Sequence, residues 1–131
     1  MGDESNRRTT AAVFDDHLRR ALAGDFEGDI EDNFAADVVL LTGVAEFRGH
    51  DGVRESRRLL REDLGDGDYE YLTRLTSGYD AFLEWRGQAE DVRIEDGADG
   101  FVIADGLIRM QWIHDTVIHR TGYRRRLNHA R

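Results

Sequence analysis

Two hydrophobic periodicities divide this chain, and their order constrains the fold more than any other feature of the sequence. From about Thr10 to Leu64 most apolar residues recur at helical spacing. From Tyr69 to Arg120 they follow strand-like runs that are rich in β-branched and aromatic residues. Helices gathered in one part of a chain and strands in another favour an α+β domain over an alternating α/β one.

The first half predicts three helices and two short strands. Thr9 or Thr10 can cap the first helix, and Gly24 can end it. His17 lies within the apolar stripe of that helix. In chain order we expect helices over Thr10–Ala23 and Asp25–Asn33, strands over Val38–Thr42 and Glu46–Gly49, and a helix over Asp51–Leu64.

The second half predicts an antiparallel meander. The pair Asp105-Gly106 between two apolar runs is a strong signal for a two-residue hairpin. Bulges are expected near Gly97 and Gly100, because isolated glycines inside a strand often mark them. The expected strands are Tyr69–Ser77, Ala81–Gln88, Val92–Ala104 and a long last strand, Leu107–Arg120.

Composition narrows the class of protein. The length of 131 residues suits one domain. All 18 basic residues are arginines and face 27 acidic residues, and the net charge of −9 argues against a nucleic-acid partner. The lack of cysteine excludes disulfides and thiolate zinc sites. No apolar run is long enough to span a bilayer, so we expect no membrane partner and a cytoplasmic location.

Four local patterns accompany this order of elements. They are Gly24-Asp25-Phe26 with Phe34-Ala35-Ala36-Asp37-Val38, then Phe47-Arg48-Gly49-His50-Asp51-Gly52-Val53, Glu84-Trp85-Arg86, and Gly97-Ala98-Asp99-Gly100-Phe101-Val102-Ile103 leading into Asp105-Gly106-Leu107-Ile108. Together they resemble the nuclear-transport-factor-2-like superfamily, and within it the SnoaL-like polyketide cyclase branch. The resemblance covers about Ala11 to Arg120.

The resemblance implies a cystatin-like cone, with three N-terminal helices packed in a strongly curved antiparallel or mixed sheet. It also implies a single SnoaL-like domain over residues 1–131, with a core at about 11–120 and flexible tails at 1–9 and 121–131. Such a cone is a natural small-molecule pocket. The superfamily hosts isomerases, cyclases, epoxide hydrolases and binding modules, so the fold alone does not fix the function.

The resemblance also suggests catalytic residues. In ketosteroid isomerase, a relative that is a standard example of a protonated aspartate, a helix tyrosine and a strand aspartate form the oxyanion hole. These positions correspond to His17 and Asp99 here. The position of that enzyme's general base corresponds to Thr42, which argues against a steroid-isomerase mechanism. In SnoaL-like cyclases the proposed acid/base is an aspartate on the last strand, and Asp115 lies at the matching place.

Strand alternation places Gln111, Ile113 and Asp115 on one face of the last strand. If that face looks inward, we expect Asp115 to transfer the proton while His17 and Asp99 orient the substrate oxygen. Burial in an apolar cavity raises a carboxyl pKa toward neutrality, where proton transfer is useful. The expected ligand contacts are Phe14, Leu60, Tyr71, Leu83, Trp85, Phe101, Ile103, Gln111 and Ile113.

The opposite face of the last strand carries Ile108, Met110, Trp112 and His114, and it is the more apolar face. The resemblance implies a homodimer that buries Met110 and Trp112; in a monomer this face would turn inward instead. No His, Asp or Glu cluster has metal-ligand spacing, so we expect neither a metal nor a cofactor. Two functions stay open: a cyclase or isomerase acting on a hydrophobic small molecule, or a non-catalytic ligand-binding or dimerisation module.

Overall fold

The computed structural model describes residues 7–43, 45–120 and 124–126, the last three in backbone only. The helices are α2 (Thr10–Ala23), α3 (Phe26–Asn33) and α4 (Gly49–Leu64). The strands are β1 (Phe34–Leu41), β2 (Glu46–Arg48), β3 (Asp68–Ser77), β4 (Asp80–Gln88), β5 (Val92–Ala104), β6 (Leu107–His114), β7 (Thr116–His119) and β8 (Arg124–Arg126).

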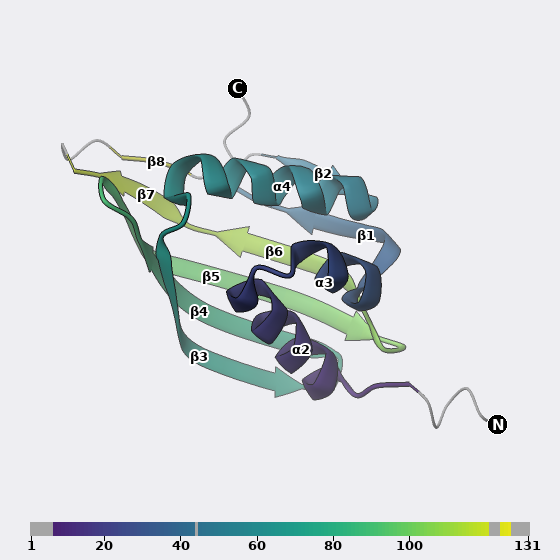
Figure 1. The fold of residues 1–131 in the computed structure, drawn as a ribbon. Helices are drawn as coiled ribbons and strands as arrows, with labels where there is room; N and C mark the ends of the chain where they lie inside the picture. The colour runs from purple at the N-terminus through teal and green to yellow at the C-terminus, as the bar shows by residue number, and fades with distance from the viewer. Residues whose placement is uncertain (1–6, 44, 121–123, 127–131) are drawn as a thin grey trace.

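The strands form one curved sheet in the order β2-β1-β6-β5-β4-β3, with β7 paired to β5 and to β8. Strands β1 and β6 are parallel and the other pairs are antiparallel, so the sheet is mixed. The three helices lie on the concave face of the sheet, and the sheet does not close on itself (Figure 1). The predicted α+β cone is therefore confirmed.

The ends of the first helix follow from the sequence. Thr9 is the N-cap, and its side chain accepts a hydrogen bond from the Ala12 amide. Gly24 ends the helix in the left-handed conformation, with φ at 78°, which glycine adopts without steric cost. In the predicted hairpin Asp105 and Gly106 both have positive φ, as a type I′ turn requires.

Two strands differ most from the prediction. Strand β1 begins at Phe34, immediately after α3 and four residues before the predicted start at Val38. The long last strand is broken at Asp115 into β6 and β7. The break follows from the bulge expected near Gly97: Trp85 faces Gly97 and Gly87 faces Ile94, so β5 holds one extra residue between these pairs. Beyond this bulge, β5 pairs with β7 instead of β6.

The second predicted bulge, at Gly100, is not formed, because Gly100 pairs in regular register with Trp112. A bulge lies instead in β6 at Arg109, between the pairs Val102–Met110 and Ile103–Ile108. The extra residue reverses the alternation, so Ile108 points into the core and is fully buried. The prediction that Ile108 shares the outer face with Met110 and Trp112 is wrong for this reason.

Both predicted tails contain ordered residues next to the core. Arg8 donates to the side chain of Asn33 and to the carbonyl oxygens of Asp32 and Gly106, which ties the start of α2 to α3 and to the hairpin. At the other end, Arg124–Arg126 pairs with β7 as strand β8. The remaining tail residues, 1–6, 121–123 and 127–131, lie outside the described part of the chain.

The apolar core fills the closed end of the cone. The rings of Phe14 on α2 and Phe101 on β5 meet edge to face, with centroids 5.2 Å apart. The largest fully buried side chains around them include Leu18, Ile30, Ile94, Ile103, Ile108, Val13, Val38, Val53 and Val117. This packing leaves the open end of the cone, between α2, α4 and the sheet, for a cavity.

Candidate active site

A cavity of about 130 Å³ lies between the helices and the concave face of the sheet. Its wall contains His17, Leu60, Tyr71, Leu83, Trp85, Asp99, Gln111, Ile113 and Asp115 from the sequence-based set. The face of the last strand with Gln111, Ile113 and Asp115 therefore looks inward, and the more apolar face with Trp112 looks outward. Mostly apolar walls with a few convergent ionisable groups are typical of small-molecule sites.

Three residues predicted as ligand contacts do not line the cavity. Phe14, Phe101 and Ile103 are each at most 1% exposed and pack in the core behind it. Strand alternation alone puts Phe101 and Ile103 on the same face as Asp99. The curvature of the sheet carries that end of β5 under α2, where helix side chains cover it.

The sequence reasoning missed other wall residues, notably Arg57 and Arg61 of α4. The complete set of additions is Leu18, Ala21, Leu22, Phe26, Leu40, Val53, Ser56, Arg57, Arg61 and Tyr69. In the sequence α4 is strongly charged, with four arginines between positions 54 and 61, so helical spacing alone does not separate the two inward arginines from the outward ones.

Asp99 is a buried carboxyl group of the cavity wall whose pKa is shifted. Its Oδ1 accepts a hydrogen bond from the Trp85 indole N–H at 2.9 Å, and its Oδ2 accepts one from the Gln111 amide at 3.1 Å. Burial raises the pKa of Asp99 to about 6, although the two hydrogen bonds and nearby positive charge act to lower it. Asp99 therefore changes its charge near neutral pH.

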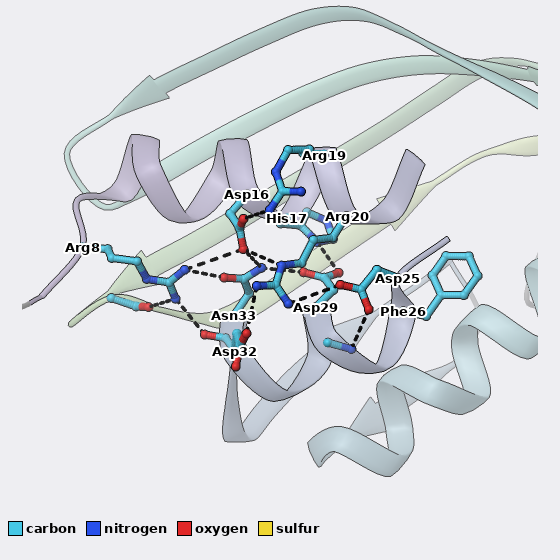
Figure 2. Close-up of polar contacts among 12 residues, drawn as sticks. Arg8, Asp16, His17, Arg19, Arg20, Asp25, Phe26, Asp29, Asp32 and Asn33 are labelled. Carbon is cyan, nitrogen blue, oxygen red and sulfur yellow. Dashed lines mark hydrogen bonds and ion pairs between the residues drawn. The ribbon is translucent and has the colours of Figure 1, made fainter. Parts of the chain in front are cut away.

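His17 is held in the wall by a buried carboxylate that the sequence reasoning did not select. Its Nδ1 lies 2.8 Å from Oδ2 of Asp29, which is completely buried on α3. Arg57 Nη2 donates to the same oxygen at 2.5 Å, and Asn33 donates to the other oxygen at 2.7 Å. Figure 2 shows His17 and Asn33 meeting Asp29 between α2 and α3.

This network fixes the charge of Asp29 and the orientation of the imidazole. Burial by itself would raise the pKa of Asp29, but His17, Arg57 and Asn33 outweigh burial and lower it. The imidazole also packs edge to face against Phe34 and Phe101, with centroids 5.4 Å away in both cases. Because Nδ1 is engaged with Asp29, Nε2 is the ring nitrogen that is left to meet a ligand.

Asp115 lies at the break between β6 and β7 and is only 4% exposed. Two tyrosines of β3 complete this side of the cavity. Burial, reinforced by the negative charge of Asp115, raises the pKa of Tyr69 to about 12. Burial also raises the pKa of Tyr71, whose hydroxyl donates to the Leu18 carbonyl at 3.3 Å. Both tyrosines are therefore neutral hydrogen-bonding groups at neutral pH.

No group of three His, Cys, Asp or Glu side chains among the described residues is arranged to hold a metal ion. In the same part of the chain, no helix combines the length and the apolar character that crossing a membrane requires. The ionisable side chains of the cavity wall are carboxyl, imidazole, phenol and guanidinium groups, which can transfer protons or form hydrogen bonds.

No family model and no curated protein sequence matches this chain. Solved structures do match it. An NTF2-like protein of unknown function from Burkholderia xenovorans has a TM-score of 0.68 at 13% identity, and the match covers 81% of each chain. A protein from Mesorhizobium loti, provisionally named a SnoaL-like polyketide cyclase, has a TM-score of 0.64 at 18% identity, over 81% of this chain and 98% of that one.

A protein from Kribbella flavida, provisionally named a ketosteroid isomerase, has a TM-score of 0.64 at 18% identity, over 79% of this chain and 75% of that one. At such low identity these likenesses establish the fold and leave the reaction open. The chain thus has the α+β cone fold of the nuclear-transport-factor-2-like proteins, among which SnoaL-like cyclases and ketosteroid-isomerase-like proteins are its structural neighbours.

Proposed function

We propose that the cavity binds a hydrophobic carbonyl compound and catalyses its isomerisation or cyclisation by proton transfer, without a cofactor. The observation that carries the proposal is Asp99, a buried carboxyl group in the cavity wall whose pKa of about 6 lies near neutrality. A carboxyl group with a pKa near the working pH is suited to general acid/base catalysis. We place this activity in the cytoplasm, which cell fractionation can test.

In this proposal the two cavity aspartates take opposite roles. The ionised carboxylate of Asp115 removes a proton from the carbon next to the carbonyl group, and the electrons of that C–H bond form the enolate. Protonated Asp99 donates to the carbonyl oxygen, and His17 orients that oxygen. In an isomerisation the proton returns from Asp115 to a different carbon. In a cyclisation the enolate carbon bonds to the carbon of a second carbonyl group, whose π electrons move to its oxygen, and that oxygen takes the proton from Asp115. Different surroundings separate the roles of the two carboxyl groups.

Exchange of carbon-bound hydrogen provides a test that requires no knowledge of the natural substrate. In D₂O we expect the protein to accelerate deuterium incorporation next to the carbonyl of 2-tetralone, followed by NMR. Asp115→Asn should abolish the acceleration while leaving the fold intact, and Asp99→Asn should lower it about 100-fold or more. Glu84→Gln, an exposed change on β4 between two cavity residues, is the matched control and should have no effect.

The pH dependence separates a catalytic Asp99 from a structural one. Because the proposed role requires the protonated form, the exchange rate should fall as pH rises through about 6. This step should be missing in Asp99→Asn. An exchange rate equal to that of the buffer, with 2-tetralone demonstrably bound, would contradict the catalytic proposal. It would support a non-catalytic binding module instead.

We also propose that the outer face of the sheet pairs with a second copy of the chain. Leu75, Phe82 and Trp112 lie in one row across β3, β4 and β6, with Gly100 between the last two. They are 62%, 39% and 41% exposed, and Met110 is half-buried beside them. Apolar patches of this kind are typical of protein interfaces.

Light scattering tests the homodimer. The wild-type chain should have twice the mass of one copy, and Trp112→Glu should have the mass of one copy because it puts a charge into the buried interface. Leu22→Glu, on the helical side of the molecule, places the same charge at a residue that is 54% exposed and should stay dimeric. A single-copy mass for the wild-type chain would refute the proposal.

A further inference from the structure

Arg61 is the exception among the arginines whose side chains the structure describes. Every other one lies within 3.9 Å of a carboxylate oxygen. Arg61 has no such partner in residues 7–43 and 45–120, although the chain holds 27 acidic residues against 18 arginines. It is also part of the cavity wall, where it is exposed and therefore lies at the rim.

The neighbour of Arg61 one turn earlier on α4 is Arg57, and both guanidinium groups face the ring of Phe26. The Cζ atom of Arg61 lies 5.7 Å from the centroid of this ring, and that of Arg57 lies 5.4 Å from it. The charge of Arg57 is compensated by the buried Asp29, whereas no carboxylate of the described part of the chain pairs with Arg61. Like charges four residues apart on a helix repel each other. An anion bound at the rim would therefore pair with the guanidinium group of Arg61 and would reduce the repulsion between Arg61 and Arg57.

We infer that the natural ligand carries a carboxylate group, which Arg61 binds at the rim of the cavity. The inference rests on the proposed function, because it names the class of ligand for the same cavity. A planar carboxylate matches the two parallel N–H donors of a guanidinium group. The apolar part of the ligand then extends inward along Leu40, Leu83 and Trp85.

The two cavity aspartates determine the direction in which such a ligand enters. Asp99 and Asp115 are 8% and 4% exposed, so they lie in the interior, whereas Arg61 lies at the rim. A carboxylate placed inward would meet the ionised Asp115 of the proposed function, and repulsion between like charges costs most where water is excluded. A carboxylate at Arg61 avoids this cost, and the carbonyl end of the ligand then faces Asp99, Asp115 and His17.

Two probes that differ only in charge test the inference. Isothermal titration calorimetry at neutral pH compares 2-naphthoate with 2-naphthamide, its neutral amide. The wild-type protein should bind the carboxylate more tightly, and Arg61→Gln should weaken that binding about tenfold, as expected for a charged hydrogen-bonded pair. The same substitution should leave binding of the amide within about twofold. Added salt should reduce the preference, because the pair at the rim is open to solvent.

Arg58→Gln is the matched control, because it removes the same charge from α4 at a residue that pairs with Glu55 and Glu62 outside the cavity. It should leave both affinities unchanged. Equal binding of the two probes, or equal effects of the two substitutions, would overturn the carboxylate inference while leaving an apolar ligand site in place. Failure of the wild-type protein to bind either probe would overturn both the inference and the proposed function.

Discussion

Asp29→Ala should be the most destabilising single substitution in the polar part of this molecule. The completely buried carboxylate accepts hydrogen bonds from His17, Arg57 and Asn33, and its removal leaves three donors without their acceptor. Breaking a buried ion pair by removing one partner costs about 3–5 kcal/mol of the free energy of unfolding. Urea denaturation followed by circular dichroism measures this loss as a lower midpoint with an unchanged slope.

Asp32→Ala on the same helix is the control. Asp32 pairs with Arg20 at 2.9 Å, but its side chain is 57% exposed, so its removal should cost far less. The pKa of Asp29 is lower in the folded protein than its ordinary value of 3.8. Its stabilisation is therefore present above that value and is lost as pH falls through the folded pKa, so wild type and variant should converge in acid. Equal losses for the two variants would refute the role assigned to the network.

Gly97→Ala should damage the fold and the candidate site together. A Cβ atom built at Gly97 would lie 2.3 Å from the ring carbons of Trp85, so the buried indole would have to move. Overpacking of this kind typically costs about 1–3 kcal/mol. The displaced indole would also lose its hydrogen bond to Asp99, which acts to lower the pKa of that carboxyl group. We therefore expect the pKa of Asp99 to rise above its value of about 6.

Gly100→Ala is the matched control in the same strand. Its Cβ would meet the ring of Trp112 at 3.3 Å on the outer face, where the indole is exposed and can shift. Urea denaturation gives the stability of both variants, and carboxyl ¹³C NMR gives the pKa of Asp99. If the two variants have the same stability and the same pKa of Asp99, the packing of Trp85 against Gly97 does not hold the side chains of the site in place.

Local signals in the sequence predicted the secondary structure well where the physical cause is itself local. Thr9 caps α2 and Gly24 ends it, because capping depends on residues within one turn. Asp105-Gly106 forms the hairpin because the turn needs two positive φ angles. Alternation placed Gln111 and Asp115 on one strand face, and the resemblance to a known cone fold indicated that this face looks inward, where both residues line the cavity.

Long-range geometry explains what the sequence did not reveal. Asp29 belongs to a short acidic helix and has the pattern of a surface residue, yet it is completely buried. Only the packing of α3 against α2 and α4 brings His17 and Arg57 within hydrogen-bonding distance of it. Likewise, nothing in the local sequence of α4 separates Arg61 from its neighbouring arginines. Its lack of a carboxylate partner within residues 7–43 and 45–120 follows from where that turn of the helix lies.

By itself, then, the sequence determined the order of helices and strands and the turns, because these depend on spacing and on backbone preferences of single residues. The tertiary structure decided the rest. The bulge at Arg109 turns Ile108 inward, and the curved sheet moves Phe14, Phe101 and Ile103 out of the cavity wall. Asp29 is buried and pairs with Arg57, whereas Arg61 lies in the cavity wall. Burial and ion pairing differ between these two residues because they depend on contacts between segments that are far apart in the chain.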